Sequence, residues 1–185
     1  MITVRRPQRA DARRNFDALL VAARDAFAAH GADTSLEDIA RTAGVGIGTL
    51  YRNFPTRQDL IEAVYVEEVT QLAEAAEALS GQPPWPALRG WLERFVAYAA
   101  TKRAIIDLLN RDSEMFGSCR AVMYEAGRPL FDRAREAGEI RPDAAFDDVL
   151  RMVSGLTATV FVDDAQRERV LTFAFDGLRN RETGF

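Results

Sequence analysis

Residues 41–55, RTAGVGIGTLYRNFP, hold the side chains of this chain that are best suited to binding a polyanion. Three glycines and three hydrogen-bond donors fall close together there: Gly44, Gly46 and Gly48, then Thr49, Tyr51 and Arg52. A hydroxyl, a phenol and a guanidinium near a helix N-terminus are donors that proteins use to contact phosphate oxygens. Because Gly48 has no side chain, the backbone there can lie close to a phosphate or a groove wall. The stretch therefore predicts contacts with a phosphate backbone.

Groups that could carry out catalysis are scattered along the chain. His30 ends a predicted helix, Cys119 has no histidine to serve as its base, and no metal-ligand spacing occurs. Two pairs of aspartates, at 147–148 and 163–164, stand where helix starts favour acids. We expect no catalytic residue, no metal and no cofactor, and hence no enzyme.

The charge is unevenly distributed. The net charge is −4, yet residues 1–60 have nine arginines against seven acids, whereas residues 61–185 have fifteen basic residues against twenty-one acids. The first fourteen residues alone contain the arginines Arg5, Arg6, Arg9, Arg13 and Arg14. A basic end on an acidic body is expected if only that end meets a polyanion. A solvated basic tail is the alternative interpretation of the same charges.

The composition indicates a soluble, cytoplasmic protein. Hydrophobic residues make up 48% of the chain, which allows a buried core without disulfide bonds. The single cysteine cannot form an internal bridge and fits a reducing compartment. No apolar run approaches the roughly 18 residues of a membrane span, and no signal peptide follows the basic start. We therefore expect no membrane partner.

The elements that must position the glycine-rich stretch are helices. Apolar residues recur at spacings of three and four over residues 9–29, which predicts one face of a first helix, and Gly31 is suited to end it. Thr34 and Glu37 form a capping box that predicts the start of a second helix. Gly44 ends that helix in a backbone conformation that other residues resist.

A short third helix is predicted over residues 46–52. Thr56, an N-cap with Asp59 three residues later, predicts a restart and a long helix over 57–79. Two short helices joined by a three-residue turn that contains glycine are the signature of a helix-turn-helix. The three glycines then have separate tasks. Gly44 ends the second helix, Gly46 begins the third, and Gly48 keeps the surface of the third helix free of a side chain.

The rest of the chain is predicted to be helical as well. A loop, SGQPPWP at 80–86, interrupts the pattern, and no segment shows the sustained alternation of a strand. Apolar spacing predicts further helices over residues 87–100, 103–111, 117–137, 144–162 and 165–180. The predicted fold class is therefore all-α.

The segment TSLEDIARTAGVGIGTLYRNFPTRQDL, residues 34–60, resembles the DNA-binding signature of the TetR family of bacterial transcriptional regulators. The family pattern is similar to T-x-x-x-I-A-x-x-A-G-V-S-x-G-T-L-Y-x-H-F-x-x-K-x-x-L, and the resemblance covers about residues 12–60. Gly46 stands where the family usually has Ser, Asn53 where it has His, and Arg57 where it has Lys. These departures concern which operator is bound and leave DNA binding as the expectation.

The resemblance implies an N-terminal arm and three-helix helix-turn-helix DNA-binding domain, residues 1–56, and a larger helical ligand-binding and dimerisation domain, residues 57–185. Contacts with the backbone of double-stranded DNA are expected from Thr49, Tyr51, Arg52, Asn53 and Arg57. The surface in the major groove is expected at Gly46, Ile47 and Gly48, with Arg41 reaching a phosphate or a base edge. An arm of Arg5, Arg6 and Arg9 is expected in a neighbouring minor groove.

The same resemblance implies a homodimer, because one helix-turn-helix reads few bases and such proteins bind two half-sites. The expected dimer surface is the apolar side of the last two helices: Val149, Met152, Val153, Leu156, Val160, Val170, Phe173, Ala174, Gly177 and Leu178. The alternative is that these side chains are buried within one subunit.

The resemblance also implies a cavity for a small, largely apolar effector in the aromatic and methionine-rich region 85–135. Its expected lining is Trp91, Phe95, Tyr98, Met115, Phe116, Met123 and Tyr124, and ordinary core packing is the alternative for each of them. The expected function is a sequence-specific repressor whose homodimer binds a palindromic operator and is released by the effector. The alternative function is a DNA-binding or partner-binding helical protein that uses the same head without a small-molecule ligand.

Overall fold

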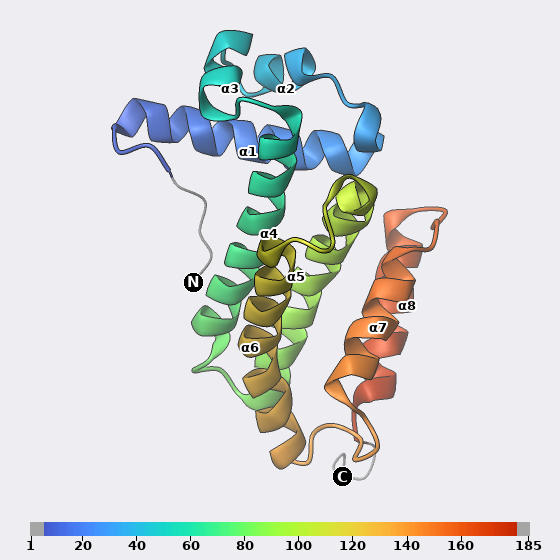
Figure 1. The fold of residues 1–185 in the computed structure, drawn as a ribbon. Helices are drawn as coiled ribbons and strands as arrows, with labels where there is room; N and C mark the ends of the chain where they lie inside the picture. Colours follow the sequence, from blue (N-terminus) through green and yellow to red (C-terminus); the bar gives the residue numbers. More distant parts are fainter. Residues whose placement is uncertain (1–5, 181–185) are drawn as a thin grey trace. The chain divides into compact units, whose positions relative to one another are not determined.

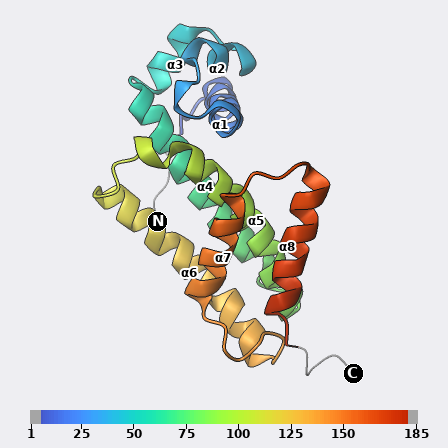
Figure 2. The ribbon, with the colours of Figure 1, turned by 90° about the vertical axis from the view of Figure 1, so that its right-hand side faces the viewer.

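Helices form almost all of the regular structure. The computed structural model describes residues 6–180, and within them eight α-helices occur with no strand beyond one isolated bridge between Ile140 and Arg179 (Figures 1 and 2). The predicted all-α fold class is confirmed. None of the described helices has both the length and the apolarity needed to cross a membrane.

The four N-terminal helices lie where apolar spacing and caps predict them. They are α1 (Ala10–His30), α2 (Leu36–Thr42), α3 (Ile47–Asn53) and α4 (Arg57–Leu79). The remaining helices are α5 (Pro84–Ile105), α6 (Glu114–Glu136), α7 (Phe146–Thr157) and α8 (Asp164–Leu178). Short 3-10 turns follow α1 at Gly31–Asp33 and α5 at Ile106–Leu108.

The structure differs from the prediction in the middle of the chain. The spacing predicts two helices, over 87–100 and 103–111, but α5 is one helix that begins at Pro84. Prolines in a first helical turn lose no hydrogen bond, because the N–H groups of that turn have no partner within the helix. The proline-rich segment that predicts a loop therefore also begins the helix, and the N–H of Ala87 bonds to the carbonyl of Pro83 at 3.0 Å.

The cap of α2 lies one residue later than predicted. The Ser35 hydroxyl, not that of Thr34, accepts the N–H of Asp38, at 3.3 Å. Thr34 is buried, and its hydroxyl lies 3.1 Å from the carbonyl oxygen of Ala26 and 2.9 Å from that of Gly31. Thr34 therefore fastens the start of α2 to the end of α1, which is a tertiary task that the capping pattern does not reveal.

The cap of α4 is confirmed. The Asp59 carboxylate accepts the N–H of Thr56 at 2.8 Å, and the Thr56 hydroxyl accepts the N–H of Asp59 at 3.1 Å. This reciprocal pair satisfies two donors at the helix start that have no partner along the helix.

The described chain forms two compact units. Residues 6–70 and 101–120 belong to the first, and residues 71–100 and 121–180 to the second. The first unit thus extends beyond the predicted head, residues 1–56. Its core includes buried residues from α1 to α4: Phe16, Leu19, Ala23, Phe27, Ile39, Leu50, Phe54 and Leu60.

Aromatic rings form the centre of the second unit. Trp91 and Phe95 on α5 have ring centres 5.6 Å apart, and those of Phe95 and Tyr98 are 5.4 Å apart. Phe146 at the start of α7 lies 5.9 Å from Trp91 and 5.5 Å from Phe131 on α6. Offset and tilted rings at these distances attract one another beyond the effect of burial alone. This cluster holds α5, α6 and α7 together.

The single cysteine provides a test of packing in the first unit. Cys119 is buried on α6, and burial raises the pKa of its thiol to about 11, although the charge of Lys102 opposes the shift. The thiolate is the reactive form of cysteine. At pH 8 we expect the folded protein to react with Ellman's reagent at least about tenfold more slowly than the urea-unfolded protein. Equal rates in the two states would show that Cys119 is accessible.

Candidate nucleic-acid interface

The turn between α2 and α3 is fixed by its backbone. Gly44 has a φ of +69°, a left-handed conformation that is unfavourable for residues with a Cβ. The N–H of Gly44 donates to the carbonyl of Arg41 at 3.1 Å, and the N–H of Val45 donates to that of Ala40 at 3.0 Å. These bonds end α2 abruptly and allow α3 to start at Ile47, so the task predicted for Gly44 is confirmed.

α3 is anchored on one side and open on the other. Leu50 on α3 and Phe54 directly after it are buried, and the Phe54 ring centre lies 4.8 Å from that of Phe16 on α1. The other side carries the exposed residues Gly46, Gly48, Tyr51 and Arg52. The apolar anchor therefore sets the direction in which this exposed surface faces.

The exposed glycines of α3 are not explained by packing within the protein. A Cβ added to Gly46 or Gly48 would meet no atom within 4 Å, and neither residue has a positive φ. Alanine would fit at residue 48, inside α3, and would favour the helix there by up to about 1 kcal/mol. Gly46 is the N-cap of α3, where glycine is preferred over alanine. An external surface that comes close to the backbone of α3 gives a reason for glycine at residue 48 that the fold itself does not.

Hydrogen-bond donors surround this bare surface. Tyr51 is 46% exposed, Arg52 is exposed, and Thr49 is half-buried. The apolar side chain of Ile47 beside them is half-buried as well. Arg41 on α2 is 79% exposed and pairs with Asp38 at 2.6 Å. Exposed ion pairs of this kind contribute little free energy, so a phosphate can take the place of the carboxylate. The donors predicted around α3 thus lie at its exposed surface.

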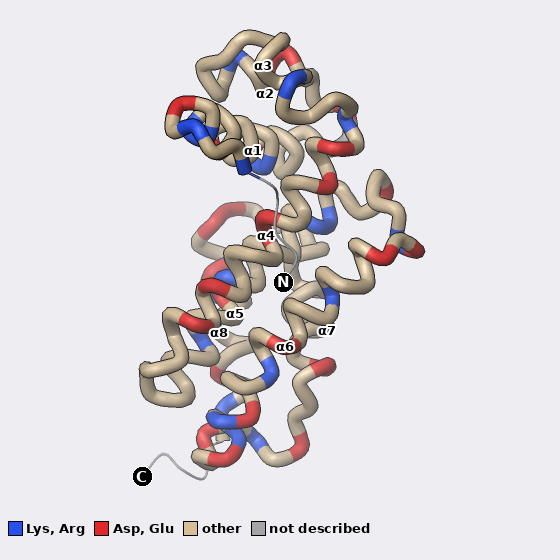
Figure 3. Tube along the Cα trace, turned by 60° about the vertical axis from the view of Figure 1, so that its left-hand side comes forward, with Lys and Arg blue, Asp and Glu red and all other residues tan. Residues whose placement is uncertain are grey.

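α3 itself carries little charge. Figure 3 shows basic and acidic positions interspersed along α1, whereas most of α3, with the sequence IGTLYRN, is uncharged. Direct recognition of base edges needs side chains that reach into the major groove. α3 offers mainly Ile47 for this, and its side chain suits contact with a thymine methyl group. DNA shape and the neighbouring arginines therefore have to supply much of any sequence preference.

Two residues expected at phosphates are used inside the protein instead. The amide of Asn53 donates to the carbonyl of Thr49, one turn earlier, at 2.8 Å. The Arg57 guanidinium donates to the carbonyl of Thr34 at 2.7 Å and lies 5.6 Å from the ring centre of Phe27. In the protein without DNA these groups hold α3 and the start of α4 in place. Their expected contacts with phosphates stay a prediction.

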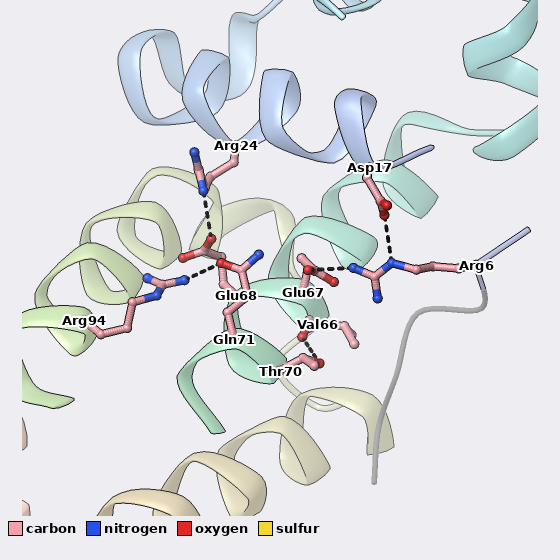
Figure 4. A network of polar contacts seen from close by, with 9 residues as sticks. All are labelled: Arg6, Asp17, Arg24, Val66, Glu67, Glu68, Thr70, Gln71 and Arg94. Atoms are coloured by element: carbon pink, nitrogen blue, oxygen red, sulfur yellow. Dashed lines mark hydrogen bonds and ion pairs between the residues drawn. The ribbon is translucent and has the colours of Figure 1, made fainter. Parts of the chain in front are cut away.

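One arginine of the expected arm, Arg6, is paired within the protein. Arg6 places its Nε 2.8 Å from Oδ1 of Asp17 and its Nη2 2.8 Å from Oε1 of Glu67 (Figure 4). The hydrogen bond to Asp17 and the attraction of Glu67 raise the pKa of Arg6 above its ordinary value. Arg6 is therefore held against the protein rather than extended towards a minor groove. Arg9 is exposed directly before α1, and Arg5 lies outside the described residues.

Most of the residues expected around an effector form core contacts. Trp91, Phe95, Tyr98 and Met123 are buried, and the hydroxyl of Tyr124 bonds to the Asp147 carboxylate. Burial of the first four residues agrees with the alternative of core packing. The two remaining residues, Met115 and Phe116, belong to the first unit, where the Phe116 ring stacks on that of Tyr65 at 5.4 Å.

The residues expected at a dimer surface divide into three groups: buried, exposed and half-buried. Val149, Val153 and Leu178 are buried within the chain, which corrects their assignment to an interface. Phe173 is 69% exposed and Val160 is 94% exposed. Gly177 is exposed as well, and the half-buried residues are Met152, Leu156, Val170 and Ala174. Since Val170, Phe173, Ala174 and Gly177 follow helical spacing, α8 presents one apolar stripe to the outside.

Sequence reasoning missed polar contacts that hold the helix-turn-helix. Glu67 and Glu68 have no place in its pattern, yet both are largely buried in the first unit. Thr34 is predicted as a cap, and its buried contact with the carbonyl of Ala26 is not. The signal for the two glutamates is the run VYVEEV, in which two acids interrupt an apolar stretch of α4. Among the residues that the structure describes, no cluster of His, Cys, Asp and Glu is arranged to hold a metal ion.

Family models match both parts of the chain. The model described as "Bacterial regulatory proteins, tetR family" matches residues 19–64, which include α2 and α3. The model described as "Transcriptional regulator SbtR-like, C-terminal domain" matches residues 83–180, more than half of the chain.

Solved structures and a curated relative agree with these models. The TetR transcriptional regulator SCO0520 from Streptomyces coelicolor is 42% identical, with 89% of this chain and 98% of that chain covered and a TM-score of 0.76. The TetR transcription regulatory protein from Mycobacterium vanbaalenii is 32% identical, with 94% and 100% covered and a TM-score of 0.70. The HTH-type transcriptional regulator SAR0097 of Staphylococcus aureus (strain MRSA252) is 35% identical over 85 residues, and the match spans only 44% of its length.

Proposed function

Because the chain belongs to the TetR family of bacterial transcriptional regulators, we propose that it is a cytoplasmic repressor whose homodimer binds a palindromic DNA operator. Its matched families and relatives are regulators of transcription and not enzymes. α3 is the helix that enters the major groove, and Arg41, Thr49, Tyr51 and Arg52 contact phosphates around it.

One observation carries this proposal: α3 keeps Gly48 on its exposed surface although the fold has room for alanine there. A helix that meets only water gains stability from alanine, so bare backbone there is unfavourable unless another molecule comes close. The donors Tyr51 and Arg52 beside Gly48 suit a phosphate backbone as that molecule.

The test combines selection of duplexes from a random pool with the variant Gly48→Ala. We expect two-fold symmetric duplexes to be enriched, and Gly48→Ala to bind them about tenfold more weakly, because the added methyl group separates α3 from the groove. The same variant should unfold at a slightly higher temperature, since alanine favours the helix. Affinity is measured by fluorescence anisotropy at fixed salt, and stability by thermal unfolding.

Gly117→Ala is the matched control, because Gly117 also lies in a helix with open space around its Cα and is outside the helix-turn-helix. It should leave DNA affinity unchanged. A pool without any enriched duplex would contradict sequence-specific binding. Unchanged affinity of Gly48→Ala would contradict the close approach of α3.

The homodimer is proposed from α7 and α8, which lie side by side in the second unit (Figures 1 and 2). The apolar stripe of α8 around Phe173 is exposed in the single chain, and burying an exposed aromatic side chain favours association. Two such helices from each subunit form a four-helix bundle, which is a common way to close a two-fold interface.

Release by a small effector is the remaining part of the proposal. Its support is a surface groove of about 510 Å³ in the second unit, within the size range of ligand sites. The lining residues are Val96, Ala100, Thr157, Thr159, Phe161, Asp163, Asp164 and Arg167. By linkage, an effector that weakens DNA binding is itself bound more weakly by the same factor when DNA is present. If no candidate compound changes operator affinity, the alternative function holds. The protein then uses the same helix-turn-helix to bind DNA or a partner without a small-molecule ligand.

A further inference from the structure

Two glutamates interrupt the apolar surface of α4. Their neighbours Val66 and Val69 are buried, yet residues 67 and 68 are both acids. The side chain of Glu67 is 13% exposed and that of Glu68 is 3% exposed. A carboxylate taken out of water is unfavourable unless a positive partner and hydrogen bonds accompany it. Their retention in this helix therefore requires partners on the elements that face α4.

Arginines from two other segments supply the partners. The guanidinium of Arg6 lies between Glu67 on α4 and Asp17 on α1, with 2.8 Å to an oxygen of each (Figure 4). Arg24 on α1 places its Nη1 4.0 Å from Oε1 of Glu68. The segment before α1 and α1 itself are thus joined to α4 by charged contacts at consecutive positions of that helix.

The geometry at Arg6 favours a fixed bridge over an arm that moves to DNA. Its Nε and Nη2 donate to two different carboxylates, which uses the planar fork of the guanidinium. If Arg6 left for a phosphate, Asp17 and Glu67 would face each other as like charges, and Glu67 is largely buried. Departure of Arg6 is therefore more unfavourable than the departure of an arginine whose acidic partners are all exposed.

A second attachment lies at the start of α4. Arg57 donates there to the carbonyl of Thr34, before α2, at 2.7 Å, and its guanidinium lies 5.6 Å from the ring centre of Phe27 on α1. Residues 57 and 67 are separated by about 15 Å along the helix. Attachment at two places this far apart resists rotation of α1 against α4 far better than attachment at one. Because Phe16 of α1 packs against Phe54, directly after α3, α3 turns together with α1.

We propose that Glu67, acting through Arg6 and Asp17, is a positioning residue for DNA binding. It fixes the angle at which the helix-turn-helix lies on α4, and Arg6 makes no contact with DNA. The inference rests on the proposed function, because it assigns these residues a role in binding DNA. It also reverses the role that the basic sequence of the arm predicts for Arg6.

The sign of a charge substitution separates positioning from simple electrostatics. Removing a negative charge near DNA strengthens binding if only charge matters. We expect the opposite for Glu67→Gln: about tenfold weaker operator binding, because α1 loses the attachment to α4 that runs through Arg6. Arg6→Gln should weaken operator binding by a similar factor. The operator affinity of the double variant should be no lower than that of the single variant with the lower affinity, because both changes break the same bridge.

The salt dependence of operator affinity is the second readout. Loss of a phosphate contact lowers the slope of log affinity against log salt by about 1, whereas loss of a positioning residue leaves the slope unchanged. Asp11→Asn is the matched control, since Asp11 is an exposed acid on α1 that pairs only across one turn with Arg14. It should bind the operator as well as the unaltered protein or slightly better.

A lower slope for Arg6→Gln, or unchanged or stronger binding by Glu67→Gln, would overturn the inference. If Glu67→Gln is unfolded at the assay temperature, Asp17→Asn replaces it, because Asp17 is half exposed and its loss leaves the Arg6–Glu67 pair intact. That variant should show a smaller loss of affinity with an unchanged slope. If the unaltered protein selects no duplex, the proposed function fails; faster amide exchange of α1 in Glu67→Gln, measured without DNA, then still tests the attachment.

Discussion

Phe173→Glu is expected to convert the protein into a folded monomer and to lower its affinity for a full palindromic operator by about 10² to 10⁴. Phe173 is 69% exposed on α8, so a glutamate there does not disturb the core of the single chain. In the proposed dimer the same position faces its two-fold partner, where two like charges would be desolvated together. Mass from sedimentation equilibrium and anisotropy on full and half operators measure both effects.

The half operator distinguishes loss of the dimer from damage to the DNA-binding head. Phe173→Glu should bind a single half-site as the unaltered protein does, because one head makes the same contacts in both. Ala165→Glu is the control, since Ala165 is exposed on α8 but lies off the stripe of Val170, Phe173, Ala174 and Gly177. It should remain a dimer. A dimeric Phe173→Glu protein would exclude this surface of α8 as the interface.

Gly127→Ala is expected to destabilise the protein by about 3 kcal/mol, near the upper end of the usual effect of overpacking a core. A Cβ at residue 127 would lie 2.2 Å from Cη2 and 2.4 Å from Cζ2 of Trp91. The Trp91 ring is fully buried between Phe95 and Phe146, and its Nε1 donates to the carbonyl of Leu72 at 3.1 Å. The ring therefore cannot move aside without losing a hydrogen bond and ring contacts. Thermal unfolding should show a decrease of roughly 10 °C in the midpoint.

A smaller ring should relieve this clash. Trp91→Phe removes the atoms nearest to residue 127 and is expected to destabilise the protein alone, because it leaves a cavity and loses the hydrogen bond from the indole to the carbonyl of Leu72. Combined with Gly127→Ala, it should cost less than the sum of the two single changes, which indicates contact between the sites. Gly155→Ala, in a helix position with open space, is the control and should leave the midpoint nearly unchanged. An unchanged midpoint for Gly127→Ala would contradict the close packing of α6 on Trp91.

The sequence by itself determined the helix-turn-helix. Gly44 ends α2, Thr56 and Asp59 cap α4, and apolar spacing predicts α1 almost to the residue. These features depend on residues within about one turn of one another, so local sequence carries them. The resemblance to the TetR family rests on the same short segment, and the family models and structural relatives confirm it.

Tertiary structure decided which side chains of the helices are available to partners. Val153 and Phe173 both follow the apolar spacing of the last helices, yet one is fully buried and the other is 69% exposed. Arg6 and Arg57 are basic residues of the DNA-binding head, yet they bond to Glu67 and to the carbonyl of Thr34. The physical reason is that spacing along one helix defines its apolar side, whereas burial and charge pairing depend on segments far away in sequence. Only the packing of α1 on α4 shows which arginines are engaged within the protein.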